Sequence, residues 1–194
     1  MEIVAIVLGY LLGSIPFALL LTRRRGIELR NVGSRNPGAA NVLRSAGVGP
    51  AVAVMLLDAA KGTVAVTAAR LITDDVAVMT SAGVAAIVGH IYPVWFGFRG
   101  GKGVAASAGV FAVLAPLATA VAALVFVVTI AATRFISAGS IAGALALPVA
   151  AAVANLPNPI VAGTLLAAAI VLVRHRDNVS RLMTGTERRI GLRL

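Results

Sequence analysis

The sequence contains no cysteine, and only 12% of its 194 residues are charged. The absence of thiols excludes disulfides and thiolate metal sites. Its two histidines and scattered carboxylates do not have the spacing of metal ligands, so we expect neither a metal nor any other cofactor. With so few charged groups, a soluble domain could not cover its core with polar surface. These shortages exclude most soluble enzymes.

Hydrophobic residues make up 59% of the chain and gather in long runs. Several runs reach or approach the roughly 20 residues that a helix needs to cross about 30 Å of hydrocarbon, whereas barrel strands would alternate. We therefore predict an all-α integral membrane protein. The apolar runs cover residues 3–22, 50–69, 76–94, 104–133, 138–154 and 159–173. Because Met1-Glu2-Ile3 lacks a basic region typical of signal peptides, we expect the first helix to be retained.

The fourth run is too long for one upright helix and short for two. Pro116 near its centre could kink a single tilted helix or form the turn of a hairpin. If it is a hairpin, every lysine and arginine except Lys61 and Arg70 falls on one side of the membrane. The positive-inside rule thus favours seven helices, with the N-terminus outside and the C-terminus cytoplasmic.

The net charge of +10 and the many small residues describe the bundle further. In a membrane protein, basic residues report orientation and contact with anionic lipid, so we expect no nucleic-acid partner. Alanine, glycine, serine and threonine allow close approach of helix backbones. We expect one compact domain, residues 1–194, in a bacterial cytoplasmic membrane. The long connections all fall on the cytoplasmic side, where a functional site is expected.

A glycine-rich stretch at residues 89–103 ends in Gly100-Gly101-Lys102-Gly103, directly before an apolar run. Glycine amides, a lysine and a helix N-terminus together favour binding of an anion. The stretch is not a P-loop, because Phe96 stands at its first glycine position and Gly103 follows the lysine. The remaining alternatives are a phosphate or carboxylate cradle and a flexible turn that contacts lipid headgroups.

The first cytoplasmic loop, residues 33–44, contains Asn36-Pro37-Gly38, which is typical of a turn. Glycine, hydroxyl and amide groups around this turn can present donors to an anion, and an arginine fork suits phosphate oxygens. The candidates here are Ser34, Asn36, Gly38, Asn41 and Arg44. An ordinary polar loop is the simpler alternative.

Asp58 and Lys61 lie inside the second apolar run, three residues apart. Unpaired charges at this depth cost about 2.5–3.5 kcal/mol each on insertion, and this spacing places both on one helix face. We favour a structural ion pair, although Lys61 could also reach a cytoplasmic cleft.

The last candidates flank the final two runs. Ser137 follows Arg134 and could be a helix cap, whereas His175, Asn178 and Arg181 share one helix face that could hold an anion. A hydrolase triad of Ser137, His175 and Asp177 is disfavoured, because Asp177 would point to another side of the helix. The basic helix end could equally complement the helix dipole and anionic lipid.

These segments, taken together, resemble the PlsY family of bacterial acyl-phosphate:glycerol-3-phosphate acyltransferases. The resemblance is carried by the loop Gly33 to Arg44, Asp58-x-x-Lys61-Gly62, Gly89-His90 through Ala105, and Arg174-His175-x-x-Asn178-x-x-Arg181-Leu182. It runs from Gly13-Ser14 to Glu187. Two positions depart from the family pattern: Arg35 stands where glycine is usual, and Ala40 where threonine is usual.

The resemblance implies a seven-helix membrane enzyme that acylates the 1-hydroxyl of glycerol 3-phosphate from acyl phosphate, without a thioester donor. It implies catalytic roles for Ser34, Lys102 and His175. Implied substrate-binding residues are Asn36, Gly38, Asn41, Arg44, Gly101, Gly103, Ser137 and Asn178, with Lys61, His90 and Arg181 as further candidates. Expected partners are the two substrates, membrane lipid and, as a further candidate, the soluble enzyme that supplies acyl phosphate.

Two other classes fit the composition less well. A carrier for a phosphorylated metabolite would place polar or broken-helix elements near the bilayer midplane and often show inverted repeats, whereas the informative residues here gather at one surface. A lipid-surface scaffold would tolerate substitution of Gly101 and Lys102.

Overall fold

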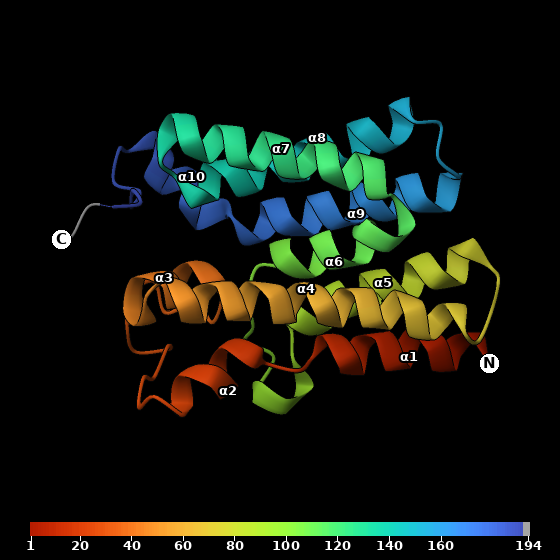
Figure 1. Cartoon of the computed structure of the whole chain (residues 1–194), viewed down its shortest axis with the longest axis horizontal. Helices are drawn as coiled ribbons and strands as arrows, with labels where there is room; N and C mark the ends of the chain where they lie inside the picture. The colour runs from red at the N-terminus through yellow and green to blue at the C-terminus, as the bar shows by residue number, and fades with distance from the viewer. Residues whose placement is uncertain (192–194) are drawn as a thin grey trace. The chain divides into compact units, whose positions relative to one another are not determined.

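The computed structural model describes residues 1–191, and every regular element in that range is a helix (Figure 1). The predicted domain, residues 1–194, and the basic tail both include residues 192–194, which lie outside the described residues. The helices are α1 (Glu2–Gly13), α2 (Phe17–Arg23), α3 (Ala39–Ala46), α4 (Val48–Arg70), α5 (Val76–Ile91), η1 (Val94–Phe96), α6 (Val104–Leu114), α7 (Pro116–Thr133), α8 (Ile136–Val153), α9 (Asn158–Arg174) and α10 (Arg176–Met183).

The chain divides into two compact units, Met1–Leu114 and Ala115–Leu194. The first contains α1 to α6, and the second contains α7 to α10. The all-α membrane fold expected from the sequence is confirmed, whereas the single domain stays a prediction.

The fourth apolar run divides at Ala115, whose φ of −147° and ψ of 61° are not helical. Proline is favoured at the first position of a helix, because the N–H that it lacks would have no partner there. Pro116 accordingly begins α7, and the run forms helices of 11 and 18 residues instead of one kinked helix. Five helical segments of the described chain are long and apolar enough to cross a membrane, or six if the bent pair α9 and α10 counts as one. Seven crossings therefore stay a prediction.

The first apolar run also contains a break that the sequence analysis did not predict. Helix α1 ends at Gly13 and α2 begins at Phe17, after Pro16. A break at this position leaves backbone carbonyls that need donors. The Lys61 ammonium group supplies one, since its Nζ lies 2.8 Å from the Ile15 carbonyl oxygen.

Glycines bring the helices of the first unit into backbone contact. A Cβ atom at Gly13 would collide with the backbone of Ala86 in α5, and one at Gly109 in α6 would collide with the backbone of Ala59 in α4. Helices in a membrane gain their packing from such close approach rather than from a hydrophobic driving force. The small residues therefore fix how α5 and α6 position the loop between them.

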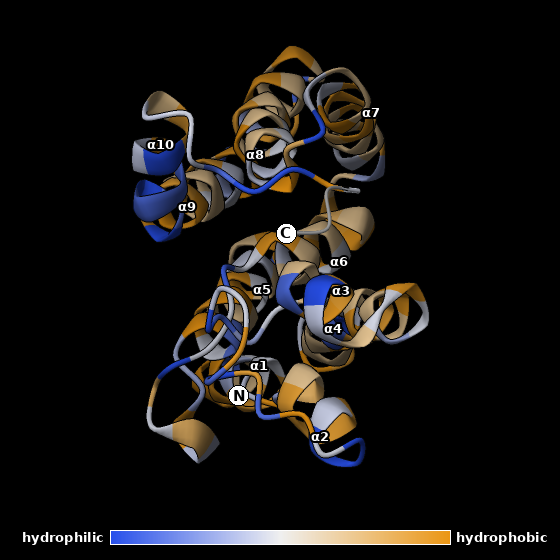
Figure 2. Ribbon diagram, turned by 90° about the vertical axis from the view of Figure 1, so that its left-hand side faces the viewer, coloured by the Kyte–Doolittle hydropathy of each residue, from blue (hydrophilic) through white to orange (hydrophobic). Residues whose placement is uncertain are grey.

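Most helices consist largely of apolar residues (Figure 2), and many of their large hydrophobic side chains are exposed. In α7, for example, Leu124, Val127 and Val128 are 63%, 57% and 57% exposed. Such a face suits contact with lipid hydrocarbon, which is as apolar as leucine itself.

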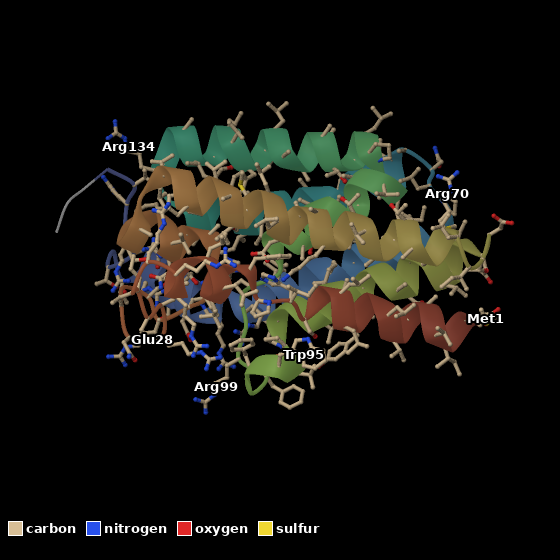
Figure 3. The ribbon with its side chains drawn as sticks, turned by 60° about the horizontal axis from the view of Figure 1, so that its bottom comes forward. Met1, Glu28, Arg70, Trp95, Arg99 and Arg134 are labelled. Carbon is tan, nitrogen blue, oxygen red and sulfur yellow. The ribbon has the colours of Figure 1, made fainter. Side chains whose placement is uncertain are left out.

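Polar loops gather at one end within each unit. In the first unit, Met1 and Arg70 lie at one end, and Glu28 and Arg99 lie toward the other (Figure 3). In the second unit, the Ile190 amide donates a hydrogen bond of 2.8 Å to the Arg134 carbonyl, so the C-terminal tail lies beside the α7–α8 turn. The loops predicted to share a membrane side thus share an end within each unit, and their cytoplasmic orientation stays a prediction.

Candidate active site

Asn41 organises the first polar loop of the first unit. Its side-chain oxygen accepts a hydrogen bond of 2.8 Å from the Ser34 amide, and its Nδ2 donates to the carbonyls of Leu29 and Val32 at 3.2 and 3.1 Å. The residue is 1% exposed. A buried amide with several satisfied hydrogen bonds rigidifies the backbone around it. In this structure Asn41 shapes the loop that presents Ser34.

The other candidates of this loop surround the Asn-Pro-Gly turn. The Gly38 amide donates to the Asn36 carbonyl at 2.9 Å, and Gly38 precedes the first turn of α3. The Arg44 guanidinium, from the same helix, lies 3.5 Å from the Ser34 hydroxyl oxygen. The loop thus brings a hydroxyl, a guanidinium and a helix N-terminus together.

The second polar loop is docked on the C-terminal end of α5. The amides of Gly100 and Gly101 donate to the carbonyls of Ile91 and His90 at 2.9 and 3.2 Å. These carbonyls are among the last of the helix and have no partner within it. The Gly101 amide, predicted to bind substrate, is therefore used in holding the loop. Amides at the start of α6, such as those of Val104 and Ala105, remain without an acceptor inside the helix.

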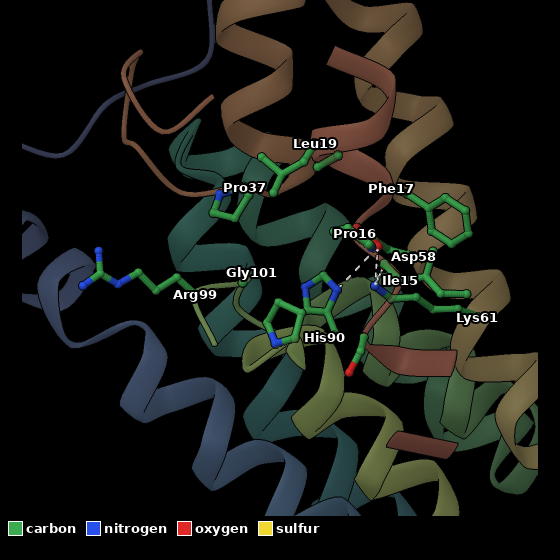
Figure 4. A pocket seen from close by; sticks show the side chains of 14 residues that line it. Ile15, Pro16, Phe17, Leu19, Pro37, Asp58, Lys61, His90, Arg99 and Gly101 are labelled. Atoms are coloured by element: carbon green, nitrogen blue, oxygen red, sulfur yellow. Dashed lines mark hydrogen bonds and ion pairs between the residues drawn. The ribbon is translucent and has the colours of Figure 1, made fainter. Parts of the chain in front are cut away.

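The two polar loops meet in the first unit. Arg30 lies three residues before the first loop, and its guanidinium donates to the carbonyls of Phe96 and Arg99 at 2.8 and 3.3 Å. These bonds tie the segment that leads into the first loop to the second loop. Pro37 from the first loop and Gly101 from the second line the same cavity of about 10 Å³ (Figure 4). Tertiary structure therefore brings together two motifs that are more than 60 residues apart in the sequence.

Three ionisable side chains line the same cavity beneath the loops (Figure 4). The Asp58 Oδ1 atom lies 2.9 Å from Lys61 Nζ and 3.4 Å from His90 Nδ1. All three residues are buried, with exposures of 2%, 4% and 8%. The predicted Asp58–Lys61 ion pair is confirmed, and His90 extends it toward the glycine-rich loop.

Ser137, Asn178 and Arg181 converge on one carboxylate in the second unit. The Glu187 Oε1 atom accepts hydrogen bonds from the Ser137 hydroxyl at 3.0 Å and from Asn178 Nδ2 at 2.8 Å. Its Oε2 atom accepts from Arg181 Nε at 2.7 Å. Residues from the start of α8, from α10 and from the tail thus form one cluster. The geometry shows that these three donors can together hold an oxyanion.

These donors also determine the acidity of the carboxylate. Burial raises the pKa of the Glu187 carboxyl, but hydrogen bonds from Arg181, Asn178 and Ser137 favour the charged form. The hydrogen bonds outweigh burial and hold the pKa of Glu187 below its ordinary value of 4.5. Glu187 is therefore ionised at neutral pH.

His175 lies at the junction of α9 and α10 and is 3% exposed. Its Nδ1 atom lies 2.8 Å from the Val171 carbonyl oxygen. A carbonyl can only accept, so Nδ1 carries the proton and, in the neutral ring, Nε2 is the acceptor. This tautomer suits a group that accepts a proton from a hydroxyl or orients it.

The structure places the candidates in two sets. The first unit contains Ser34, Asn36, Gly38, Asn41, Arg44, Lys61, His90, Gly101, Lys102 and Gly103, and the second contains Ser137, His175, Asn178 and Arg181. Among residues 1–191, no group of three or more His, Cys, Asp or Glu side chains could hold a metal ion. Glu187 was not among the predicted site residues, although it contacts three of them. The only signal for it was an isolated glutamate in an arginine-rich tail.

These features define a class of protein: an all-helical membrane protein with two polar loops at one end of its first unit, each carrying basic side chains and main-chain amides. Comparison with known proteins is more specific. The family model described as glycerol-3-phosphate acyltransferase matches residues 3–185. The chain belongs to this family and is an acyltransferase.

Similar proteins cover nearly the whole chain. A glycerol-3-phosphate acyltransferase of Geobacter sulfurreducens is 42% identical over 97% of both chains, and one of Agrobacterium fabrum is 46% identical over 96% of this chain and 91% of its own. The crystal structure of the integral membrane enzyme PlsY in its glycerol 3-phosphate form matches with a TM-score of 0.94 and 37% identity. That match covers 98% of this chain and 96% of the PlsY chain. The lysophosphatidic acid form matches with a TM-score of 0.91 and 35% identity.

Proposed function

We propose that the protein transfers a fatty acyl group from acyl phosphate to the 1-hydroxyl of sn-glycerol 3-phosphate, which gives lysophosphatidate and inorganic phosphate. The acceptor and the product are inferred from the similarity to PlsY, which has been solved in a glycerol 3-phosphate form and in a lysophosphatidic acid form. The choice of acyl phosphate as the acyl donor is supported by the family resemblance and by the residues of the two polar loops.

The chemistry needs little beyond positioning. Acyl phosphate is an activated mixed anhydride, so attack by the hydroxyl oxygen on the carbonyl carbon forms the ester as the bond to the phosphate oxygen breaks. The hydroxyl proton leaves on the released phosphate. The protein has to hold two phosphates side by side and stabilise the developing oxyanion.

The first unit supplies the groups that we assign to the donor. Lys102 and the amides at the start of α6 bind the phosphate near the reacting centre. Ser34 and Asn36 hold the donor phosphate or the carbonyl oxyanion, with Asn41 and Gly38 shaping the loop that carries them. The amide of Gly101 already donates to His90, so its part in the site is to let the loop approach closely.

The family resemblance supports a role in binding glycerol 3-phosphate for Arg44 of the first unit and for a set of residues in the second unit. Ser137, His175 and Asn178 bind this acceptor, and Arg181 adds positive charge. The ability of Ser137, Asn178 and Arg181 to hold the Glu187 carboxylate supports this assignment, because the same donors suit phosphate oxygens. We place the site at the cytoplasmic face of a bacterial inner membrane, within reach of a soluble enzyme that supplies acyl phosphate.

The test is a reaction of the purified protein in detergent or lipid with acyl phosphate and glycerol 3-phosphate. We expect lysophosphatidate and inorganic phosphate in equal amounts, and no product from acyl-CoA or an acyl-carrier-protein thioester. Turnover with a thioester alone would overturn the proposed donor. Lys102→Ala should reduce kcat by about 100-fold or more, in the range seen when one preorganised oxyanion donor is removed. Arg99→Ala is the matched control, as a neighbouring basic residue of the same loop without an assigned role.

A further inference from the structure

The glycine-rich loop lies directly on the imidazole ring of His90. A Cβ atom at Gly101 would have the Nε2, Cε1 and Cδ2 atoms of His90 as its three nearest neighbours, and the Nε2 contact is too short for any side chain. The Gly101 amide also donates to the His90 carbonyl. Both the backbone and the ring of one residue therefore determine where this part of the loop lies.

The opposite side of the His90 ring faces a buried charge. Its Nδ1 atom lies 3.4 Å from Asp58 Oδ1, which in turn lies 2.9 Å from Lys61 Nζ (Figure 4). Since the carboxylate can only accept, it favours a proton on Nδ1 and fixes the ring's orientation. Lys61 compensates the charge of Asp58, which would otherwise be costly at this depth.

Lys61 connects the same cluster to the break in the first apolar run. Its ammonium group donates to the Ile15 carbonyl at 2.8 Å, next to Pro16, and lies 5.8 Å from the centre of the Phe17 ring. Lys61, Asp58 and His90 thereby connect the α1–α2 break with α4 and α5. A purely structural ion pair between Asp58 and Lys61 would not need the third member, His90.

We propose that His90, oriented by Asp58 and Lys61, is a positioning residue that sets the place of Gly101 and hence of Lys102 and the start of α6. This inference rests on the proposal that the Lys102 loop binds phosphate. His90 does not touch the reacting atoms; it acts through the loop. Misplacing a catalytic group by 1 Å can cost about 100-fold in rate, so a support below the loop has measurable consequences.

The experiment measures the inhibition constant of inorganic phosphate, a product that should compete with acyl phosphate for the enzyme. It also measures kcat and the KM values for acyl phosphate and glycerol 3-phosphate. His90→Asn keeps a side-chain amide that can face Asp58 but removes the part of the ring beneath Gly101. We expect its inhibition constant for phosphate and its KM for acyl phosphate to rise about tenfold, with the KM for glycerol 3-phosphate unchanged. A change in kcat alone, or values equal to wild type, would overturn the proposal.

A second substitution tests the contact itself. Gly101→Ala places a methyl group against the ring, so it should weaken phosphate inhibition more than His90→Asn does. The double variant frees the space that the methyl group needs, so its phosphate affinity should exceed that of Gly101→Ala alone. Such a rescue is the non-additive coupling expected of two residues in direct contact. Losses that multiply in the double variant would overturn the direct contact.

Two controls separate this inference from loss of folding and from failure of the proposed function. Thr80→Val changes another buried polar residue of α5, whose hydroxyl has no hydrogen-bond partner in the described structure, and should leave all constants unchanged. Lys102→Ala should abolish phosphate inhibition. If it does not, the proposed phosphate site fails; if it does and His90→Asn has no effect, only the positioning role fails. Failure of His90→Asn and His90→Gln to fold in detergent would also overturn the positioning role in favour of a structural one.

Discussion

Each unit contains a carboxylate that gathers its neighbours, but the two are held in different ways. Asp58 is 2% exposed and lies between a lysine and a histidine that are also buried. The Glu187 side chain is 7% exposed, yet its partner Arg181 is 40% exposed and its other donors are a hydroxyl and an amide. The first cluster lies among membrane-spanning helices, and the second joins a helix start, a helix end and the tail.

This difference teaches which energy term holds each cluster together. Water cannot solvate a charge that is buried inside the bundle, so removing one partner leaves the other charge uncompensated. A carboxylate at the end of a helix bundle keeps access to water, and its hydrogen bonds exchange with solvent at a smaller cost. We expect substitutions in the first cluster to affect the whole fold of the first unit, and those in the second to affect mainly the tail.

The largest effect is expected from Asp58→Ala, which leaves Lys61 buried without its counter-charge. Breaking a buried pair in this way costs about 3–5 kcal/mol. The measurement is the free energy of unfolding, from titration of the detergent-solubilised protein with a denaturing detergent. Asp58→Ala combined with Lys61→Met should recover part of the loss, because it removes both charges. A double variant that is less stable than Asp58→Ala would contradict the role of charge compensation.

A smaller effect is expected from Glu187→Ala, which removes the acceptor for Ser137, Asn178 and Arg181. The loss should be about 1–3 kcal/mol, because buried polar groups lose their partner but water is near. Hydrogen exchange should report it as faster exchange over residues 184–190. Activity should fall with it, if Ser137 and Asn178 bind the acceptor.

Asp177→Ala is the matched control for Glu187→Ala. Asp177 is also an acidic residue of the C-terminal segment, but its side chain is 77% exposed and pairs with Arg176 at 3.6 Å. Exposed ion pairs are worth about 0–1 kcal/mol, so exchange over residues 184–190 should stay as in wild type. If the two substitutions had equal effects, non-specific attraction between carboxylates and arginines, and not the hydrogen bonds of Glu187, would hold the tail.

Acidification should release the tail without changing any residue. The pKa of Glu187 is lower in the folded protein than its ordinary value of 4.5, so its contribution to stability is complete above that value. It is lost as the pH falls through the lowered folded-state pKa. Hydrogen exchange of the Ile190 amide, corrected for intrinsic rates, should become faster in this acidic range. It should stay constant across the neutral range, roughly pH 6 to 8, where Glu187 remains ionised. Glu187→Gln should remove the step.

The local parts of this arrangement can be predicted from the sequence. Two opposite charges three residues apart in an apolar run predict an ion pair, and Asp58 and Lys61 form one. A proline in the middle of an overlong run predicts a break, and α7 begins at Pro116. In both examples the pattern and its consequence lie within one or two helical turns.

The parts that depend on tertiary packing could not be predicted in this way. Glu187 reaches Ser137 from 50 positions away, and no spacing rule connects a tail glutamate with a helix start. The contact of His90 with Gly101 depends on a loop that turns back onto the helix end. The break at Pro16 was missed because the run 3–22 is uniformly apolar, and its donor, Lys61, comes from another helix.

The smallest effect is expected from substituting two arginines, one in each unit, that have left-handed backbone conformations. Arg35 has a φ of 58° and Arg134 a φ of 62°. This conformation costs a side-chain-bearing residue roughly 1–2 kcal/mol, and glycine avoids the cost but loses more entropy on folding. Arg35→Gly and Arg134→Gly should therefore each raise the unfolding temperature slightly, whereas Arg24→Gly, at a φ of −61°, should lower it. If Arg35→Gly alone lowers stability or activity, the Arg35 side chain contributes a contact of its own, because the backbone change is the same at both sites.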